Sequence, residues 1–200
     1  MKYFGILIVV LTFSTTIASA QTKQGNWFSS SSIGVSLSNF AGDIEDAKSR
    51  FGFAINTEIG YNVTDWFAPS IGLTNTYQGV GYSVVDKSLY MDILSVPLLL
   101  NFSAGPVTLK AGIQPDFILS ARMNDMSYID QLKTVSFSAP IALNWNFASD
   151  GDGDLWFVDL RYHLGLTKLN KDVAFTNGWR TPGSIRNSVV MLTVGYKCDL

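Results

Sequence analysis

Apolar and polar residues alternate with a period of two along most of the chain, which is the pattern of β-strands that have one apolar face. In the segment Phe51–Tyr61, one phase is mostly aromatic and aliphatic, whereas the other carries Gly, Ala, Asn and Glu. The pattern predicts eight strands, at Ile33–Asn39, Phe51–Tyr61, Trp66–Tyr77, Tyr90–Phe102, Val107–Phe117, Val135–Phe147, Leu155–Thr167 and Val189–Cys198.

Alternation alone does not say which face meets water, because a soluble barrel has its apolar phase inside and a membrane barrel has it outside. The polar phases are mostly Gly, Ala, Ser, Thr and Asn, whereas a solvated outer face would be rich in Lys and Glu. Most of the strands are also as long as the about 9 to 11 residues that a tilted transmembrane strand needs. We therefore predict an all-β fold, an eight-stranded antiparallel transmembrane β-barrel; the alternative architecture is a soluble periplasmic ligand-binding barrel.

The connections between the predicted strands alternate in length, as expected for short periplasmic turns and long external loops. The short ones are 62–65, 103–106 and 148–154, and the long ones are 40–50, 78–89, 119–133 and 168–188. Both chain ends then fall on the periplasmic side. Aromatic residues gather near both ends of the strands and predict two girdles, formed by Trp66, Phe67, Phe102, Trp145, Phe147, Trp156 and Phe157 beside the short turns and by Phe51, Tyr77, Tyr90 and Phe117 toward the long loops.

Charged residues are rare in the predicted inward phases, and the signs of those that occur sum to zero. Opposite charges in a closed lumen are expected to neutralise one another, because an unpaired buried charge is costly. We predict a polar network that fills the lumen and consists of Glu58, Lys110, Asp116, Asp159, Arg161, His163 and Lys197.

The fourth predicted strand and four prolines do not fit a simple alternation. The segment Tyr90–Phe102 has apolar residues in both phases, so its faces stay unassigned. Each proline inside a strand removes a hydrogen-bond donor from the ladder, and a closed barrel has no free edge to accommodate it. We expect local ladder breaks, and bulges as their form, at Pro69, Pro97, Pro115 and Pro140.

Residues 1–20 have the features of a secretory signal peptide, with Lys2 before an apolar run and the sequence Ala18-Ser19-Ala20 at the expected cleavage site. We therefore assign 1–20 to a signal peptide and 21–200 to the barrel. The chain is 47% hydrophobic and only 15% charged, where about 25% is usual for a soluble domain. Its net charge of −2 gives no basic surface for nucleic acid, which we exclude as a partner.

Several motifs are moderately specific when they occur together. They are Leu94-Ser95-Val96-Pro97-Leu98-Leu99-Leu100, Ala111-Gly112 and Arg161-Tyr162-His163-Leu164-Gly165-Leu166-Thr167. On the basis of these motifs, the mature chain resembles the PorT-like outer membrane β-barrel family of Bacteroidota. The resemblance implies a location in the cell outer membrane, contact with its lipid, and assembly by the barrel-assembly machinery. It also implies a link to protein secretion, with secretion-system or other envelope proteins as partners. The C-terminal positions usually held by an aromatic residue here carry Cys198 and Leu200.

Three functions of different classes remain open from the sequence: a non-enzymatic structural or accessory barrel, a small diffusion pore, and a lipid A-modifying enzyme. An eight-stranded lumen is just filled by side chains, which disfavours the pore. His163 is the single histidine, and no serine lies in a nucleophile motif, which disfavours the enzyme. No pattern predicts a cofactor, and the Asp150–Asp154 repeat lacks the remaining ligands of a calcium loop. The preferred accessory function places partner contacts in the longest loop, on Phe175, Trp179, Arg180 and Arg186.

Overall fold

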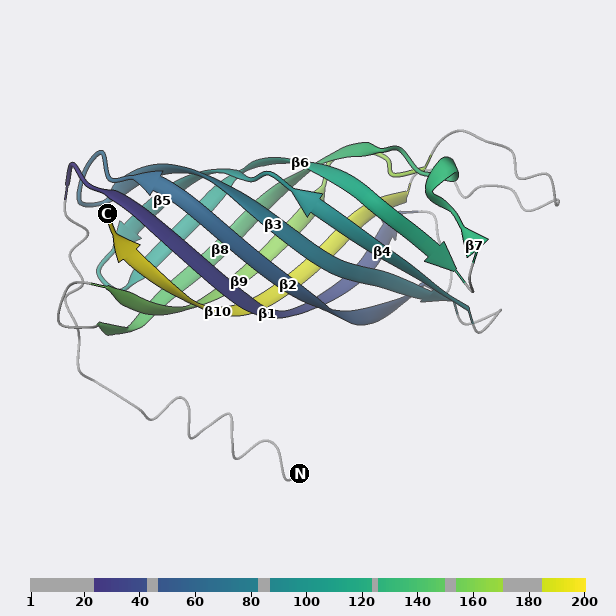
Figure 1. Ribbon diagram of the computed structural model, residues 1–200, viewed down its shortest axis with the longest axis horizontal. Helices are drawn as coiled ribbons and strands as arrows, with labels where there is room; N and C mark the ends of the chain where they lie inside the picture. Colours follow the sequence, from purple (N-terminus) through teal and green to yellow (C-terminus); the bar gives the residue numbers. More distant parts are fainter. Residues whose placement is uncertain (1–23, 43–46, 83–86, 124–125, 150–153, 171–184) are drawn as a thin grey trace, which may run out of the picture.

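The structure, a computed structural model, describes residues 24–42, 47–82, 87–123, 126–149, 154–170 and 185–200 (Figure 1). The predicted signal peptide lies outside the described residues. Among the residues described, no helix is long and apolar enough to cross a membrane.

The chain forms one antiparallel sheet that closes on itself (Figure 1). Closure is made by β1, which pairs with β2 on one side and with the last strand, β10, on the other. A short 3-10 helix, η1 (Ile129–Gln131), precedes β8. The strands are β1 (Trp27–Gly42), β2 (Ala47–Tyr61), β3 (Phe67–Tyr82), β4 (Lys87–Ser95), β5 (Leu98–Ala104), β6 (Val107–Met123), β7 (Met126–Ser127), β8 (Val135–Ser149), β9 (Leu155–Gly165) and β10 (Ile185–Asp199).

Eight strands form the barrel wall, because β4 and β5 are two parts of one strand and β7 is a two-residue extension paired only with β6. The predicted fold class is therefore confirmed. The C-terminus lies at the same end as the turns that join β2 to β3 and β5 to β6, where the backbone N–H of Leu200 donates to the carbonyl of Trp27 over 2.8 Å. We call this the turn end.

Strand lengths were underestimated from the sequence. The first strand, predicted as Ile33–Asn39, begins at Trp27 and ends at Gly42, and it pairs with β10 from Phe28 to Gly42. The alternation is lost in Ser29–Ser32, where four serines follow one another, but backbone pairing does not require an apolar phase. The connections at the end opposite the turn end are correspondingly shorter than predicted.

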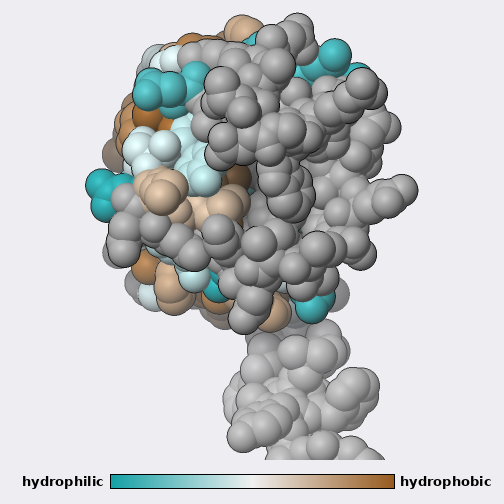
Figure 2. All heavy atoms as spheres, turned by 90° about the vertical axis from the view of Figure 1, so that its right-hand side faces the viewer, coloured by the Kyte–Doolittle hydropathy of each residue, from teal (hydrophilic) through white to brown (hydrophobic). Residues whose placement is uncertain are grey.

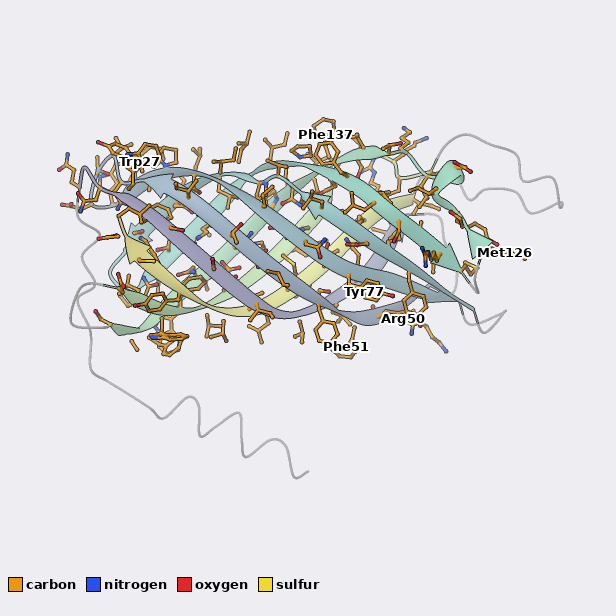
Figure 3. The ribbon with its side chains drawn as sticks, viewed as in Figure 1. Trp27, Arg50, Phe51, Tyr77, Met126 and Phe137 are labelled. Carbon is orange, nitrogen blue, oxygen red and sulfur yellow. The ribbon has the colours of Figure 1, made fainter. Side chains whose placement is uncertain are left out.

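The wall is apolar outside and polar inside, the reverse of a soluble protein (Figure 3). In β8, for example, Ile141 and Leu143 are about half exposed, whereas the alternating Ala142 and Asn144 are buried. More polar than apolar side chains are buried among the described residues. Figure 2, which views the barrel from the end opposite the turn end, also shows hydrophobic residues on its outer wall. An apolar outer wall is expected for a barrel in contact with lipid.

The fourth wall strand is interrupted at Pro97, one of the four prolines, which separates β4 from β5. Pro115 lies opposite this gap, and its carbonyl accepts the N–H of Val96. The pairing of β6 with β8 skips the positions opposite Pro140, and that of β2 with β3 ends before Pro69. The predicted ladder breaks are thus found at Pro97, Pro115 and Pro140, whereas Pro69 lies where the β2–β3 pairing ends and is paired with Leu100 of β5. The expectation that these breaks take the form of bulges was wrong. The register shifts lie away from the prolines, at 49–53, 92–93 and 146–148.

An apolar cluster inside the barrel explains why both phases of the fourth strand are apolar. The inward side chains of β4 pack against Ile118 and Ala121 of β6 and against Leu132 and Leu169, which lie outside the strands. The backbone N–H of Lys133 donates to the carbonyl of Leu169 over 2.8 Å, which holds these two segments together. The apolar cluster consists of Leu89, Met91, Ile93, Ile118, Ala121, Leu132 and Leu169.

Exposed aromatic residues form bands near both ends of the barrel. Trp66 stacks on Phe102 at the turn end, with ring centroids 6.3 Å apart, and Tyr77 stacks on Tyr90 toward the opposite end, at 6.0 Å. The assignment of Phe157 to a girdle was wrong. It is 4% exposed and lies in the inward phase of β9 with Asp159, so it fills the lumen instead.

Candidate functional site: the charged lumen

The predicted lumen residues lie on the inner face of β2, β6, β9 and β10. Most of them are buried, while Lys197 is half-buried near the turn end. They are brought together as separate groups rather than as one continuous chain of contacts. The buried members are Glu58, Lys110, Asp116, Asp159, Arg161 and His163.

A salt bridge crosses the lumen between Glu58 on β2 and Lys110 on β6. The ammonium nitrogen of Lys110 lies 2.8 Å from one carboxylate oxygen, and the hydroxyl of Ser70 donates to the other over 2.7 Å. Ser70 in turn accepts a hydrogen bond of 2.8 Å from the amide of Asn101. Both charges are thereby paired and hydrogen-bonded, which is the condition for keeping a buried ion pair.

A second ion pair lies on one strand. Asp159 and Arg161 are two residues apart in β9, so both side chains point inward, and the guanidinium Nε lies 3.2 Å from the carboxylate. Each of these side chains is nearly fully buried. Four of the six predicted lumen charges therefore neutralise one another in pairs.

Asp116 is held by neutral donors instead of a cation. Its carboxylate accepts hydrogen bonds from the hydroxyls of Ser95 and Ser138 and from the amide of Gln114, at 2.5 to 2.7 Å. The amide nitrogen of Gln114 also lies 3.1 Å from Nδ1 of His163. Because the amide nitrogen of Gln114 can only donate, Nδ1 of His163 is the acceptor of this hydrogen bond. Asp116 and His163 thus belong to one polar group bridged by Gln114.

Lys197 contacts an aromatic ring rather than a predicted acidic partner. Its ammonium nitrogen lies 4.3 Å from the ring centroid of Phe28 on the neighbouring strand β1. A cation at this distance from a ring face is stabilised by the negative electrostatic potential of the ring. This contact occupies the turn end of the lumen, away from the apolar cluster.

Sequence reasoning missed several partners of these charges. Ser95 escaped because the faces of its strand could not be assigned, yet counting back in steps of two from the polar Asn101 places it inside. Ser70 and Ser138 carried no signal beyond membership of a polar phase. The choice of Lys110 as the partner of Glu58 depends on which strands face each other across the lumen, which alternation does not reveal.

The arrangement of these side chains is typical of a closed lumen rather than of a catalytic or metal-binding site. The ion pairs and the Asp116 group fill the middle of the lumen, and the apolar cluster fills it toward the opposite end. No group of three metal-ligating side chains occurs among the residues described. Of the predicted partner loop, Phe175, Trp179 and Arg180 lie outside the described residues, while Arg186 is exposed on β10.

Comparisons with known proteins agree with this architecture. Residues 6–197 match the family described as "Outer membrane protein beta-barrel domain". No curated protein matches the chain. Among solved structures, OprG from Pseudomonas aeruginosa is similar with a TM-score of 0.54 and 12% identity, over 90% of this chain and 98% of that chain.

Two other solved structures are similar at lower scores. Neisserial surface protein A has a TM-score of 0.49 and 14% identity, over 86% of this chain and 95% of that one. Ail of Yersinia pestis has a TM-score of 0.49 and 18% identity, over 88% and 100%. On the family match, which spans nearly the whole sequence, the chain belongs to the outer membrane protein beta-barrel domain family and is a protein of the cell outer membrane.

Proposed function

We propose that this outer-membrane barrel is a non-enzymatic, structural or accessory protein of the cell envelope that acts through its external end. The external end is the one opposite the turn end, because barrels of this kind have short turns on the periplasmic side. The observation that carries the proposal is the filled lumen. A barrel whose interior is occupied by ion pairs and packed apolar side chains offers its outer surfaces, rather than a channel, for interactions.

The alternative of a small diffusion pore has less support. The Glu58–Lys110 bridge joins opposite walls, and Arg161 with Asp159 occupies the same interior. Toward the external end, Met91 and Ile93 are 1% exposed and Leu169 is fully buried in the apolar cluster. Water would have to displace the paired charges and then the packed side chains of the apolar cluster.

The alternative of a lipid A-modifying enzyme also has less support. A nucleophile and its base must lie within hydrogen-bond reach of each other and of the lipid substrate. His163 is 4% exposed on the inner face of β9, and its Nδ1 is engaged by Gln114. Asp159 is committed to Arg161. The histidine therefore faces a closed lumen, on the far side of the wall from membrane lipid.

The finer part of the proposal is a PorT-like accessory role in protein secretion, with secretion-system or envelope proteins as partners. It is supported by the motifs shared with the PorT-like family, including Leu94–Leu100 and Arg161–Thr167. The partner contacts are assigned to the longest external connection, in which Phe175, Trp179 and Arg180 precede the exposed Arg186. Aromatic residues and arginine are enriched among the residues that contribute most to binding in protein interfaces. Assembly of the barrel itself is assigned to the barrel-assembly machinery.

Replacing residues 171–184 by a short Gly-Ser linker is expected to abolish cross-linking of envelope partners in intact cells. The barrel should still show the heat-dependent gel shift of a folded outer-membrane protein, because the replaced residues lie between strands. The matched control replaces 83–86, in another external connection, and should keep the cross-links. Unchanged cross-links after replacement of 171–184 would refute this assignment of the partner surface.

A further inference from the structure

Two arginines flank a tyrosine on the outer face of the barrel near its external end. A guanidinium nitrogen of Arg50 donates to the hydroxyl of Tyr90 over 2.9 Å, and the guanidinium carbon lies 4.5 Å from the Tyr90 ring centroid. Arg122 is the direct cross-strand neighbour of Tyr90, and it is exposed. Side chains directly opposite each other on neighbouring strands have Cβ atoms about 5 Å apart. We name these three residues the Arg50–Tyr90–Arg122 cluster.

One register shift brings Arg50 to this outer face. Along β2, Gly52 and Ala54 point inward, so regular alternation would turn Arg50 inward as well. Between Ser49 and Phe53, β2 contains one residue more than β3 does opposite it. Such a bulge re-aims the side chains that precede it. The guanidinium accordingly reaches Tyr90, which is exposed on the outer face, and Figure 3 shows Arg50 beside the outward-pointing Phe51 and Tyr77.

Gly79 on β3 lies next to the Arg50 side chain. It pairs with Tyr90, and a Cβ atom placed there would lie 3.6 Å from Cδ of Arg50. The hydroxyl of Ser38 on β1 donates to the carbonyl of Gly79 over 2.7 Å and accepts its N–H over 2.9 Å. Ser38 thus satisfies backbone groups that the bulge leaves without partners in the ladder, so the bulge is a stable feature of the wall.

A second, independent register shift turns Arg122 outward. Asp116 and Ile118 of β6 are buried inside, so strict alternation would also place Arg122 inside. The pairing of β6 with β4 shifts by one residue between Ile118 and Ser120, and beyond it Ala121 is the buried residue. Two separate bulges therefore place two arginines on the same outer patch, on either side of one tyrosine.

The cluster lies in the aromatic band of the external end, where lipid head groups meet the barrel. Tyr90 stacks on Tyr77, and Phe51 and Phe53 are 82% and 68% exposed on the same face. The carboxylate of Asp92, two residues from Tyr90 along β4, accepts a hydrogen bond of 2.9 Å from Asn75. Within the described part of the chain, neither arginine of the cluster has an ion-pair partner.

We propose that the Arg50–Tyr90–Arg122 cluster binds the phosphate of an anionic lipid in the outer leaflet. A guanidinium presents a planar fork of N–H donors that matches phosphate oxygens. Arg50 uses one donor on Tyr90, so further donors of both arginines remain for the phosphate. The exposed phenylalanines next to the cluster then contact the acyl chains of the same lipid. This lipid site goes beyond the accessory role proposed above and does not depend on any protein partner.

Native mass spectrometry of the purified protein, titrated with bisphosphorylated lipid A, tests the site. The Arg50→Gln/Arg122→Gln variant is expected to bind at least about tenfold more weakly, because it loses the charge-assisted hydrogen bonds that both guanidinium groups donate to the phosphate. Lys133→Gln/Lys168→Gln is the matched control, since it removes the same charge from exposed positions elsewhere near this end. That control should bind as the wild type does.

Further variants and a second lipid distinguish a specific phosphate site from general electrostatic attraction to the lipid. Arg50→Lys/Arg122→Lys keeps the charges but removes the planar forks, and it should fall between the wild type and the glutamine variant. It also preserves the test if the glutamine variant does not fold. Lipid A with both phosphates removed should bind the wild type as weakly as it binds the variant. The proposal would be overturned if the wild type and Arg50→Gln/Arg122→Gln bound lipid A with equal affinity, or if Lys133→Gln/Lys168→Gln lost as much affinity as Arg50→Gln/Arg122→Gln. It would also be overturned if the wild type bound lipid A equally well with and without its phosphates.

Discussion

Replacing Glu58 by glutamine is expected to lower the free energy of unfolding by about 3–5 kcal/mol, the usual cost of removing one partner of a buried ion pair. The reason is that the ammonium of Lys110 then stays buried without a countercharge, while its only slight exposure gives water little access. Glutamine preserves the size of the side chain and an acceptor for Ser70, so lost packing contributes little. Urea unfolding in lipid vesicles, followed by tryptophan fluorescence, measures the change.

The control for this prediction removes both charges. Glu58→Gln combined with Lys110→Met should recover most of the lost stability, because an apolar replacement leaves no buried charge unpaired. Asp65→Asn, at an exposed position in the turn between β2 and β3, should change stability by less than about 0.5 kcal/mol. If Glu58→Gln were as harmless as Asp65→Asn, the salt bridge would not be the buried interaction described above.

A lysine at position 141 is expected to destabilise the barrel in vesicles by about 2–4 kcal/mol, the cost of a basic residue on the lipid face at the midplane. Ile141 is 49% exposed on the outer face of β8. It lies midway in sequence between two outward-facing aromatic residues, Phe137 and Trp145. The same urea titration of Ile141→Lys in vesicles measures the cost.

The matched control for Ile141→Lys is Met126→Lys. Met126 is 67% exposed on β7 at the external end, outside the apolar band. A lysine there remains in contact with water, so its effect should stay within about 0.5 kcal/mol. Equal effects at the two positions would mean that the outer face of β8 is not embedded in lipid.

The period-two pattern was sufficient to predict the eight strands and, in most of them, the inner and outer faces. In Phe51–Tyr61 and Val135–Phe147 the two phases differ in both size and polarity, and a lipid-facing wall around a narrow lumen requires that difference. The same reasoning placed Glu58, Lys110 and Asp159 inside, where the structure has them. The pattern could not predict which charged residues form ion pairs, because pairing across the lumen depends on which strands the closed barrel places opposite each other.

Other features could not be assigned from the alternation. The inner face of β4 is apolar because it packs against Leu132 and Leu169, which come from distant parts of the sequence. The outward positions of Arg50 and Arg122 result from one-residue bulges, and a bulge shifts the phase of a strand without a marker residue of its own. Strict alternation would have added both arginines to the lumen.

Current recording from the purified protein in a planar lipid bilayer tests most directly the central claim, a lipid-facing barrel with a filled lumen. Insertion should be verified in parallel by the heat-dependent gel shift of the reconstituted sample, and a large porin should be recorded as a positive control. We expect no steady conductance, because the Glu58–Lys110 and Asp159–Arg161 pairs and the apolar cluster block a continuous water path. A stable single-channel current from verified, inserted protein would contradict the account.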